Sequence, residues 1–416
     1  MEKLFLSVLN MSLTASFIIA AICVARLPLK KAPKIISYTL WVVAGFRLVF
    51  PFTLESSFSL LPFKSQPIPT DIAMQAVPRI DSGIAIIDNA VSSSLPAATL
   101  DASVNPLQIL IFIGSCAWLF GIAVMLIYSF VSIILLKHRL RSAIHIESNL
   151  YEADNLKTPF VIGLFRPRVY IPARLSDEER RYIVLHEQTH IRRHDHAAKM
   201  FAYLVLCLHW FNPLAWVAFI LMGADMEMSC DERVMRELGR DIKNAYSMSL
   251  VRLAAGRKTL NGNPLAFGEG GMKERIKNVL NFKKHSRVII VTAVALVAVL
   301  SVGFAVDRVG DTQSLLQEIT GATHEQAEQI ESHLAECEVS YQTIANSINP
   351  ITEGMDTNWQ AYDLVTENGS SYVLILRKSD NEFAAVLDNE GRLISGFIDN
   401  GVTPALFIDG NKTSHK

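Results

Sequence analysis

The sequence has little cysteine and almost no positive charge before its first apolar segment. Its five cysteines in 416 residues stand far apart, at Cys23, Cys116, Cys207, Cys230 and Cys337. Only the last of these lies beyond residue 306, so a disulfide framework is excluded as the basis of the fold. Only Lys3 contributes positive charge before the apolar segment that begins at Leu4. A cleaved signal peptide carries positive charge before its apolar core, so we expect an uncleaved anchor instead.

The composition argues against a soluble protein. Half of the residues are hydrophobic and the mean hydropathy is +0.27, which points to membrane spans. The net charge of −1 hides a split between the two ends of the chain. Residues 307–416 hold 18 acidic and 6 basic residues, whereas residues 1–306 hold 22 acidic and 33 basic residues. This asymmetry predicts a basic membrane-bound part and an acidic tail on opposite sides of a bilayer.

Four apolar segments are long enough to cross a bilayer, at 4–25, 35–52, 107–136 and 288–306. Basic residues gather at one end of these segments: Arg26, Lys30, Lys31, Lys34, Lys137, Arg139, Arg141, Lys283, Lys284 and Arg287. The positive-inside rule then places all of them in the cytoplasm of a bacterium. We expect an extracytoplasmic N-terminus, an external loop at 53–106, a cytoplasmic region at 137–287 and an extracytoplasmic domain at 307–416.

Two apolar segments leave alternatives open. Arg47 lies within the second span, where it either pairs inside the helix bundle or extends to the outer surface. Residues 201–221 are long enough to cross, but the Asn212-Pro213 turn signal interrupts them. We interpret 201–221 as two short helices that dip into the membrane from inside, with a true span as the alternative.

The motif "HEQTH" indicates a metal site. Ser176 and Glu179 form a capping-box pattern, which predicts a helix that begins near Asp177. On that helix His186 and His190 share one face. H-E-x-x-H is the zincin arrangement, in which two imidazoles bind Zn²⁺ and the intervening glutamate, here Glu187, acts as general base.

Two further histidines follow the motif. His194 is a further turn along the same helix, about 12 Å from His186 along the axis, and His196 is farther still. Zinc–nitrogen bonds are about 2 Å long, so one ion does not reach both ends of a straight helix. We therefore assign local polar roles to His194 and His196. His194 is also a candidate for a residue that contacts a zinc ligand without binding the ion itself.

A catalytic zinc needs a third protein ligand. Within "DMEMSCDERVM", Glu227 and Asp231 are four residues apart and share a helical face. Glu227 could be the ligand, with Asp231 orienting a histidine. Cys230 is the rival ligand, and a solvated acidic helix face is the plain alternative. The spacing alone does not choose between them.

Several motifs together resemble one family. "LHEQTHIRRHDH", "LHWFNPLAW" and "EMSCDERV" occur in an order and spacing similar to those of BlaR/MecR-type membrane metallopeptidases. "TPFVIGLFRPRVYIP" resembles the segment before their zinc helix, and "LWVVAGFRLVFP" resembles their second span. The resemblance covers about residues 1–306. It implies that His186, His190 and Glu227 bind one zinc ion and that Glu187 is catalytic.

The resemblance also implies the architecture. We expect a mainly α-helical multi-pass membrane protein with a zincin-like (gluzincin) metalloprotease domain at 137–287. Within that domain, 159–163 and 168–172 read as two short strands joined near Arg166-Pro167. One of them offers an edge to an extended peptide substrate, or the pair is a purely structural hairpin.

The tail departs from the best-known members of that family, which carry an external penicillin-binding domain. "SDN" occurs at 379–381, but no S-x-x-K precedes it in the tail, and about 110 residues are too few for that fold. We interpret "SDN" as a turn. A capped helix at 323–338 and alternating runs near 361–366, 372–378, 383–388 and 393–398 predict a small α+β domain. It could sense a ligand, bind a partner or cap the protein.

A glycine-rich segment precedes the final span. Residues 257–276 contain four glycines and one proline, which predicts a loop. We hypothesise that its residues Pro264, Phe267 and Gly268 lie across the zinc cleft as a gate, or are cleaved there. A solvated linker is the alternative.

These observations lead to one expected function. With the resemblance, we expect a zinc endopeptidase of a bacterial plasma membrane that cleaves a BlaI/MecI-type transcriptional repressor, itself, or both. The alternatives are a housekeeping membrane protease and a non-catalytic receptor that retains the zinc fold. The expected partners are membrane lipids, a protein or peptide substrate and, as an option, a second copy of the chain, without direct contact to nucleic acid.

Overall fold

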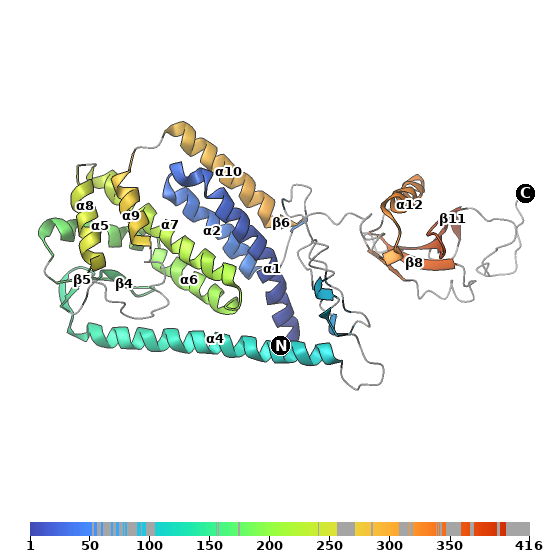
Figure 1. Cartoon of the computed structure of the whole chain (residues 1–416), viewed down its shortest axis with the longest axis horizontal. Coiled ribbons are helices and arrows are strands. Elements are labelled where there is room, and N and C mark those ends of the chain that lie inside the picture. Colours follow the sequence, from blue (N-terminus) through green and yellow to red (C-terminus); the bar gives the residue numbers. More distant parts are fainter. Residues whose placement is uncertain are drawn as a thin grey trace, which may run out of the picture. The chain divides into compact units, whose positions relative to one another are not determined.

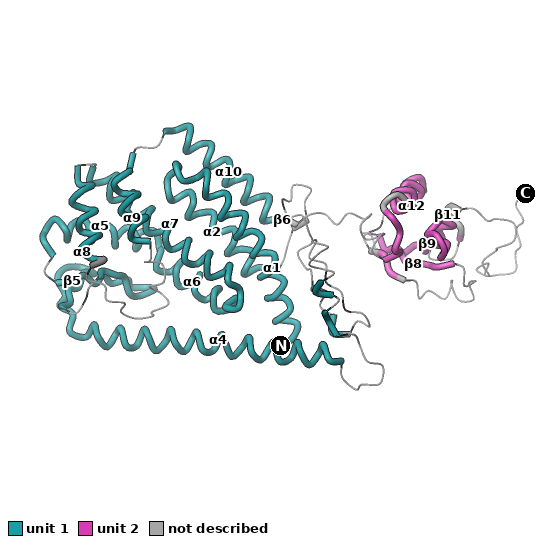
Figure 2. Tube along the Cα trace, viewed as in Figure 1, with its two compact units in different colours: residues 1–308 teal, residues 309–416 magenta. Residues whose placement is uncertain are grey.

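The structure is a computed structural model, and it divides into two compact units. Unit 1 comprises Met1–Arg308 and unit 2 comprises Val309–Lys416 (Figure 2). The described residues are 1–51, 54–55, 60, 68–69, 72–74, 78, 80, 90–92, 94–96, 105–154, 156, 158–173, 175–239, 241–255, 271–283, 286–307, 316, 319–337, 339, 341, 343–346, 359–366, 370–388 and 392–396.

Six helices form the apolar part of unit 1 (Figure 1). Their bounds are α1 Glu2–Ala25, α2 Lys34–Val49, α4 Pro106–Arg139, α6 Asp195–Leu208, α7 Pro213–Leu238 and α10 Arg287–Ala305. Side chains from α1, α2, α7 and α10 form one buried core, which includes Ile18, Leu40 and Ala293. Helices α1, α2 and α10 and the first half of α7 are apolar almost all round, as expected for helices that face lipid on one side and each other on the other side.

Four helical segments in the described part of the chain are long and apolar enough to cross a membrane. They are Glu2–Ala25, Pro106–Ser142, Pro213–Leu238 and Arg287–Ala305. The predicted spans 4–25, 107–136 and 288–306 thus correspond to helices. The predicted second span, 35–52, forms a helix of only 16 residues, which is about 24 Å long. Its crossing of the membrane remains a prediction.

The segment 201–221 forms a helical hairpin, as predicted. The prediction that both of its helices are short is wrong for the second one. Helix α7 continues without a break to Leu238 and includes Glu227. Hydrogen bonds of Asn212 hold the turn. Its Oδ1 accepts from the backbone N–H of Leu214 and so caps α7, and its side-chain amide donates to Ser12 Oγ over 2.7 Å. The ring of His209 is fully buried and its Nε2 contacts the carbonyl oxygen of Leu48 at 2.8 Å. An Asn-Pro pair therefore begins a helix here, because proline fits its first turn.

Arg47 pairs inside the helix bundle. Its side chain is buried, and its Nε donates to the carbonyl oxygen of Phe304 over 2.7 Å. Phe304 lies in the last turn of α10, where backbone carbonyls lack helical partners. A guanidinium at that position satisfies such a carbonyl and links α2 to α10.

The remaining elements of unit 1 surround the histidine motif. They include helices α5 Asp177–Arg192, α8 Lys243–Ala255 and α9 Met272–Leu280, and strands β2 Ile144–Glu147, β3 Leu150–Ala153, β4 Phe160–Ile162 and β5 Arg168–Pro172. The four strands form one sheet in the order β2-β3-β5-β4, with β4 antiparallel to β5 at one edge. The predicted strand pair at 159–163 and 168–172 is confirmed. Short elements complete the unit: η1 Pro28–Lys31, η2 Ile72–Met74, η3 Leu140–Ser142, and the parallel pair β1 Leu54–Glu55 and β6 Val306–Asp307.

The described part of unit 2 includes helix α12 and an antiparallel sheet. Helix α12 His324–Glu336 begins with a capping box between Thr323 and Gln326, which confirms the predicted capped helix. The strands are β7 Thr343–Asn346, β8 Trp359–Val365, β9 Ser371–Arg377, β10 Phe383–Asp388 and β11 Leu393–Gly396, in the order β11-β10-β9-β8-β7. Four of them confirm the predicted runs, while β7 was not predicted. The "SDN" sequence lies in the turn between β9 and β10, as predicted.

Candidate metal centre

Helix α5 presents the histidine motif. Its first turn is fixed by a reciprocal capping box, in which Glu179 N donates to Ser176 Oγ over 3.2 Å and Ser176 N donates to Glu179 Oε2 over 3.1 Å. The predicted helix start at Asp177 is confirmed. His186, Glu187 and His190 are all buried on the inner side of this helix. Two imidazoles and a carboxylate are therefore removed from bulk water within about one helical turn.

The helix ends earlier than the sequence suggested. Helix α5 stops at Arg192, and His194 adopts a left-handed conformation with φ of 58° as the N-cap of α6. The placement of His194 on a continuing zinc helix is therefore wrong. His194 is exposed, and its ring lies beside that of His196 with centroids 6.2 Å apart. The chain reverses at this point, so the side chain that returns to the motif is the next one, Asp195.

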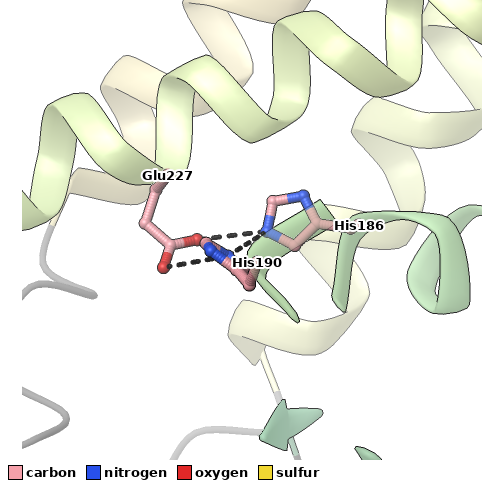
Figure 3. A group of neighbouring side chains, drawn as sticks. All are labelled: His186, His190 and Glu227. Carbon is pink, nitrogen blue, oxygen red and sulfur yellow. Dashed lines mark hydrogen bonds and ion pairs between the residues drawn. The ribbon is translucent and has the colours of Figure 1, made fainter. Parts of the chain in front are cut away.

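Helix α7 brings Glu227 against the two histidines (Figure 3). His186 Nε2 lies 3.3 Å from Glu227 Oε2 and 3.2 Å from His190 Nε2, and His190 Nε2 lies 3.7 Å from Glu227 Oε1. A tetrahedral zinc ion with bonds of about 2.0–2.1 Å separates its ligand atoms by about 3.3 Å. The donor atoms of these three side chains therefore have the chemistry and the approximate spacing that one zinc ion requires.

Cys230 approaches His190 from its other ring nitrogen. Its Sγ lies 3.4 Å from His190 Nδ1 and 3.6 Å from Asp195 Oδ2, so these three residues form a second group of potential metal ligands. Arg193 Nη1 also lies within hydrogen-bond distance of this sulfur, at 3.5 Å. This second group excludes His186, whereas the group with Glu227 uses both histidines of the motif. The geometry thus favours Glu227 over Cys230 as the partner of the histidine pair.

Glu187 lines the same cleft as the three candidate ligands. The cleft has a volume of about 550 Å³, and its walls include Phe160, Val161 and Ile162 of β4. Burial raises the pKa of Glu187 above its ordinary range, and Glu227 adds to this rise, although the two neighbouring histidines oppose it. A glutamate whose pKa is raised toward neutrality is a better general base at physiological pH.

A carboxylate lies beside the Nδ1 atom of each histidine, away from the Nε2 atom that faces the other candidate ligands. His190 Nδ1 lies 2.9 Å from Asp195 Oδ2, and His186 Nδ1 lies 3.3 Å from Asp231 Oδ1. A carboxylate at Nδ1 fixes the ring so that Nε2 is free to bind a metal. The structure therefore places Asp231 where the sequence suggested. Asp195, five residues after His190, was missed, although a carboxylate beside the motif was visible in "RRHDH".

Two more side chains at the site were missed by the sequence analysis. Tyr246 of α8 donates its hydroxyl to Asp231 Oδ1 over 2.7 Å and lies 3.1 Å from His186 Nδ1. Arg275 of α9 contacts Asp231 and Glu227. Neither residue belongs to a motif, and both reach the site only because α8 and α9 pack against α7. The proposed gate residues Pro264, Phe267 and Gly268 lie outside the described residues.

Helix α2 also contacts two aspartates next to the candidate ligands, Asp195 and Asp225. Tyr38 donates its hydroxyl to Asp195 Oδ1 over 3.4 Å, and Trp41 Nε1 donates to Asp225 Oδ2 over 2.9 Å. Asp225 precedes Glu227 by two residues on α7 and also forms a bidentate pair with Arg26, at 2.9 and 2.7 Å. The apolar bundle and the candidate ligands are therefore one structural unit.

Asp195 provides a direct test of this arrangement. We expect Asp195→Asn to lower zinc affinity about 10–100-fold, the usual effect of losing a carboxylate behind a zinc-bound histidine. The measurement is competition with a zinc chelator on the detergent-purified protein. Asp241→Asn is the matched control, because Asp241 is exposed. Equal affinities for the two variants would contradict a supporting role for Asp195.

Comparison with known proteins agrees with these features. The family model described as BlaR1 peptidase M56 matches residues 6–279. The chain therefore belongs to the BlaR1 peptidase M56 family, and the resemblance noted in the sequence is confirmed. Family membership and the long apolar helices together describe a membrane protein related to metallopeptidases.

Individual relatives share part of the chain. The Regulatory protein BlaR1 of Bacillus licheniformis is 27% identical over 197 residues, which are 41% of this chain and 33% of that protein. The Methicillin resistance mecR1 proteins of Staphylococcus aureus and Staphylococcus epidermidis are each 27% identical over 135 residues, which are 30% of this chain and 23% of theirs. The similarity thus spans a third or less of the length of each relative.

Proposed function

We propose that this chain is a zinc endopeptidase with a zincin-like fold, in which His186, His190 and Glu227 hold the metal. One observation carries the proposal: donor atoms of three side chains from two helices lie 3.2–3.7 Å apart beside a buried glutamate in a cleft. A purely structural zinc site has four protein ligands, whereas a catalytic site keeps one position for water. The donor set His-His-Glu fits the second type.

The chemistry of peptide hydrolysis assigns a role to Glu187. Zinc, when bound, lowers the pKa of its water toward neutrality and polarises the scissile carbonyl. Glu187 takes the proton from the attacking water and delivers it to the amine that leaves. Asp195 and Asp231 keep the rings of His190 and His186 in place during these steps, through contacts at Nδ1.

The substrate in this proposal is an extended peptide. Strand β4 is an edge strand, paired with β5 on one side, and its residues Phe160–Ile162 line the cleft. The edge of a sheet can bind an extended chain through main-chain hydrogen bonds. A volume of about 550 Å³ accommodates a few residues around a scissile bond.

We further propose that the site faces the cytoplasm. Arg26 at the end of α1 pairs with Asp225, and Lys34 N donates to Glu232 Oε2 over 3.0 Å, on either side of Glu227 along α7. These contacts support a location of the candidate ligands near the basic ends of α1 and α2. Basic segments beside membrane helices prefer the cytoplasmic side. Residues 201–221 would then dip from that side, and unit 2 would be extracytoplasmic.

The family suggests the physiological role. We propose cleavage of a BlaI/MecI-type transcriptional repressor, of the chain itself within 257–271, or of both. Unit 2 would modulate this activity from outside the cell membrane.

The test is a cleavage assay with the full chain in detergent and a purified repressor of this type. We expect mass spectrometry to detect defined repressor fragments, reduced to background by a zinc chelator and restored by added zinc. Cleavage that continues unchanged after metal removal would contradict a zinc mechanism. Zinc-dependent cleavage of the chain alone, with the repressor intact, would assign the activity to self-processing.

A further inference from the structure

Arg275 is an unusual residue in α9. The other charged residues of this helix, Lys273, Glu274 and Lys277, are exposed, whereas Arg275 is 7% exposed. It shares the inner face with Met272 and Val279, at the spacing where an apolar residue is expected. A buried arginine needs charged or polar partners that offset the loss of hydration.

The partners of Arg275 belong to the candidate metal centre: two carboxylates, and His186 Nε2, which lies 3.4 Å from Arg275 Nη2. Its Nε donates to Asp231 Oδ2 and its Nη2 to Asp231 Oδ1, both over 2.8 Å, which is the bidentate geometry of a strong pair. Its Nη1 lies 3.0 Å from Glu227 Oε2. One planar guanidinium therefore spans two carboxylates that are one turn apart on α7. A lysine cannot make this fork, because its ammonium is a single point of charge.

The packing of α9 fixes where this guanidinium lies. Val279 and Phe282 are buried in a core with Val234 and Tyr246. Lys243 Nζ donates to the carbonyl oxygens of Leu280 and Phe282, over 3.2 and 2.6 Å, and so satisfies the end of α9. The helix is thus held at both its apolar face and its C-terminal end, and this packing points Arg275 toward Asp231.

Asp231 depends on this contact for its own orientation. Its side chain is fully buried, and its oxygens contact Arg275, Tyr246 and His186. A buried carboxylate with only neutral partners is costly, and removing one member of a buried ion pair leaves an uncompensated charge. Without Arg275, the carboxylate that fixes the ring of His186 would lose its arginine partner.

We infer that Arg275 is a positioning residue that completes the metal centre from α9, by compensating and aligning Asp231 so that His186 presents Nε2 to the metal. The inference rests on the proposed zinc site and deepens it. It also places a determinant of metal binding in the helix that directly precedes α10. The site is therefore incomplete without residues 272–280, which lie beyond the H-E-x-x-H and Glu227 segments.

The test is zinc affinity, measured by chelator competition on the detergent-purified full chain, for Arg275→Met, Arg275→Lys, Asp231→Asn and the double variant Arg275→Met/Asp231→Asn. We expect each of the two Arg275 single variants to lose about 10–100-fold in affinity. The double variant should lose less affinity than the product of the two single losses, because Arg275 acts in part through Asp231. A general loss of stability would not produce this non-additivity. Arg252→Met is the matched control, since Arg252 is an exposed arginine of the neighbouring helix α8.

A spectroscopic readout separates ligand geometry from folding. Cobalt substitution reports the coordination of the site, and we expect Arg275→Lys to alter the cobalt absorption spectrum while Arg252→Met leaves it unchanged. If Arg275→Met is not recovered folded, Arg275→Lys carries the comparison. Affinities of both Arg275 variants within threefold of the wild type, or effects of Arg275→Met and Asp231→Asn that simply multiply, would overturn the inference. A wild-type chain that does not bind zinc would overturn the proposed metal site itself.

Discussion

Glu187→Gln should leave zinc bound and reduce peptide hydrolysis about 10²–10⁴-fold, the range that a positioned general base contributes. Glutamine nearly keeps the size and shape of glutamate but cannot accept the proton of the attacking water. His186, His190 and Glu227 remain in place, so the metal content should be unchanged. The measurement combines zinc analysis of the purified protein with the initial rate of repressor or peptide cleavage.

Glu178→Gln is the matched control for this experiment. It makes the same chemical change on the same helix, but Glu178 is exposed in the first turn of α5. We expect its rate to equal that of the wild type. A Glu187→Gln variant that cleaves at the wild-type rate would rule out Glu187 as the base. Loss of zinc in this variant would instead show that Glu187 supports the metal site.

Removal of a candidate ligand should have the largest effect on the metal. We expect His190→Ala and Glu227→Ala to lower zinc affinity by more than the roughly 10–100-fold caused by substituting a residue that only contacts a ligand. The reason is that a site with three protein ligands then keeps only two. Proteolysis should fall to background in both variants. Metal analysis after dialysis against a weak chelator measures the first effect, and the cleavage assay measures the second.

His194→Ala is the control for ligand removal. His194 is exposed at the N-cap of α6, on the far side of the chain reversal from His190. Its substitution should leave zinc content unchanged. Full zinc retention in Glu227→Ala would reassign the third ligand. Cys230→Ala would then identify the replacement, since Cys230 Sγ lies 3.4 Å from His190 Nδ1.

The placement of the site links chemistry to the membrane part of the chain. Helix α7 is apolar in its first half and carries Glu227, Cys230 and Asp231 in its second half. Helix α2 contacts Asp195 and Asp225 through Tyr38 and Trp41, and it contacts α10 through Arg47. The helices that hold the candidate ligands therefore pack directly on helices that are apolar enough to lie in a bilayer.

Local sequence determined much of this protein. A period of 3.6 residues and a Ser-x-x-Glu cap specify α5, and with it the common face of His186 and His190. The alternation of apolar and polar residues specified four strands of unit 2, and the apolar segments specified the long helices. These features depend on neighbours within a few residues, so a single sequence contains the information.

Only the tertiary structure decided how the distant residues meet. The end of α5 at Arg192 depends on a left-handed residue at His194, and this reversal brings Asp195 rather than His194 to His190. The rotation of α7 against α5 places Glu227 beside both histidines and Cys230 beside His190 alone, although the two residues lie on one helix about a turn apart. Arg275 reaches Asp231 across 44 residues of sequence through the packing of α9 on α7. Spacing along a chain fixes which side chains share a helical face, but the contacts between faces depend on how buried surfaces from separate helices fit together.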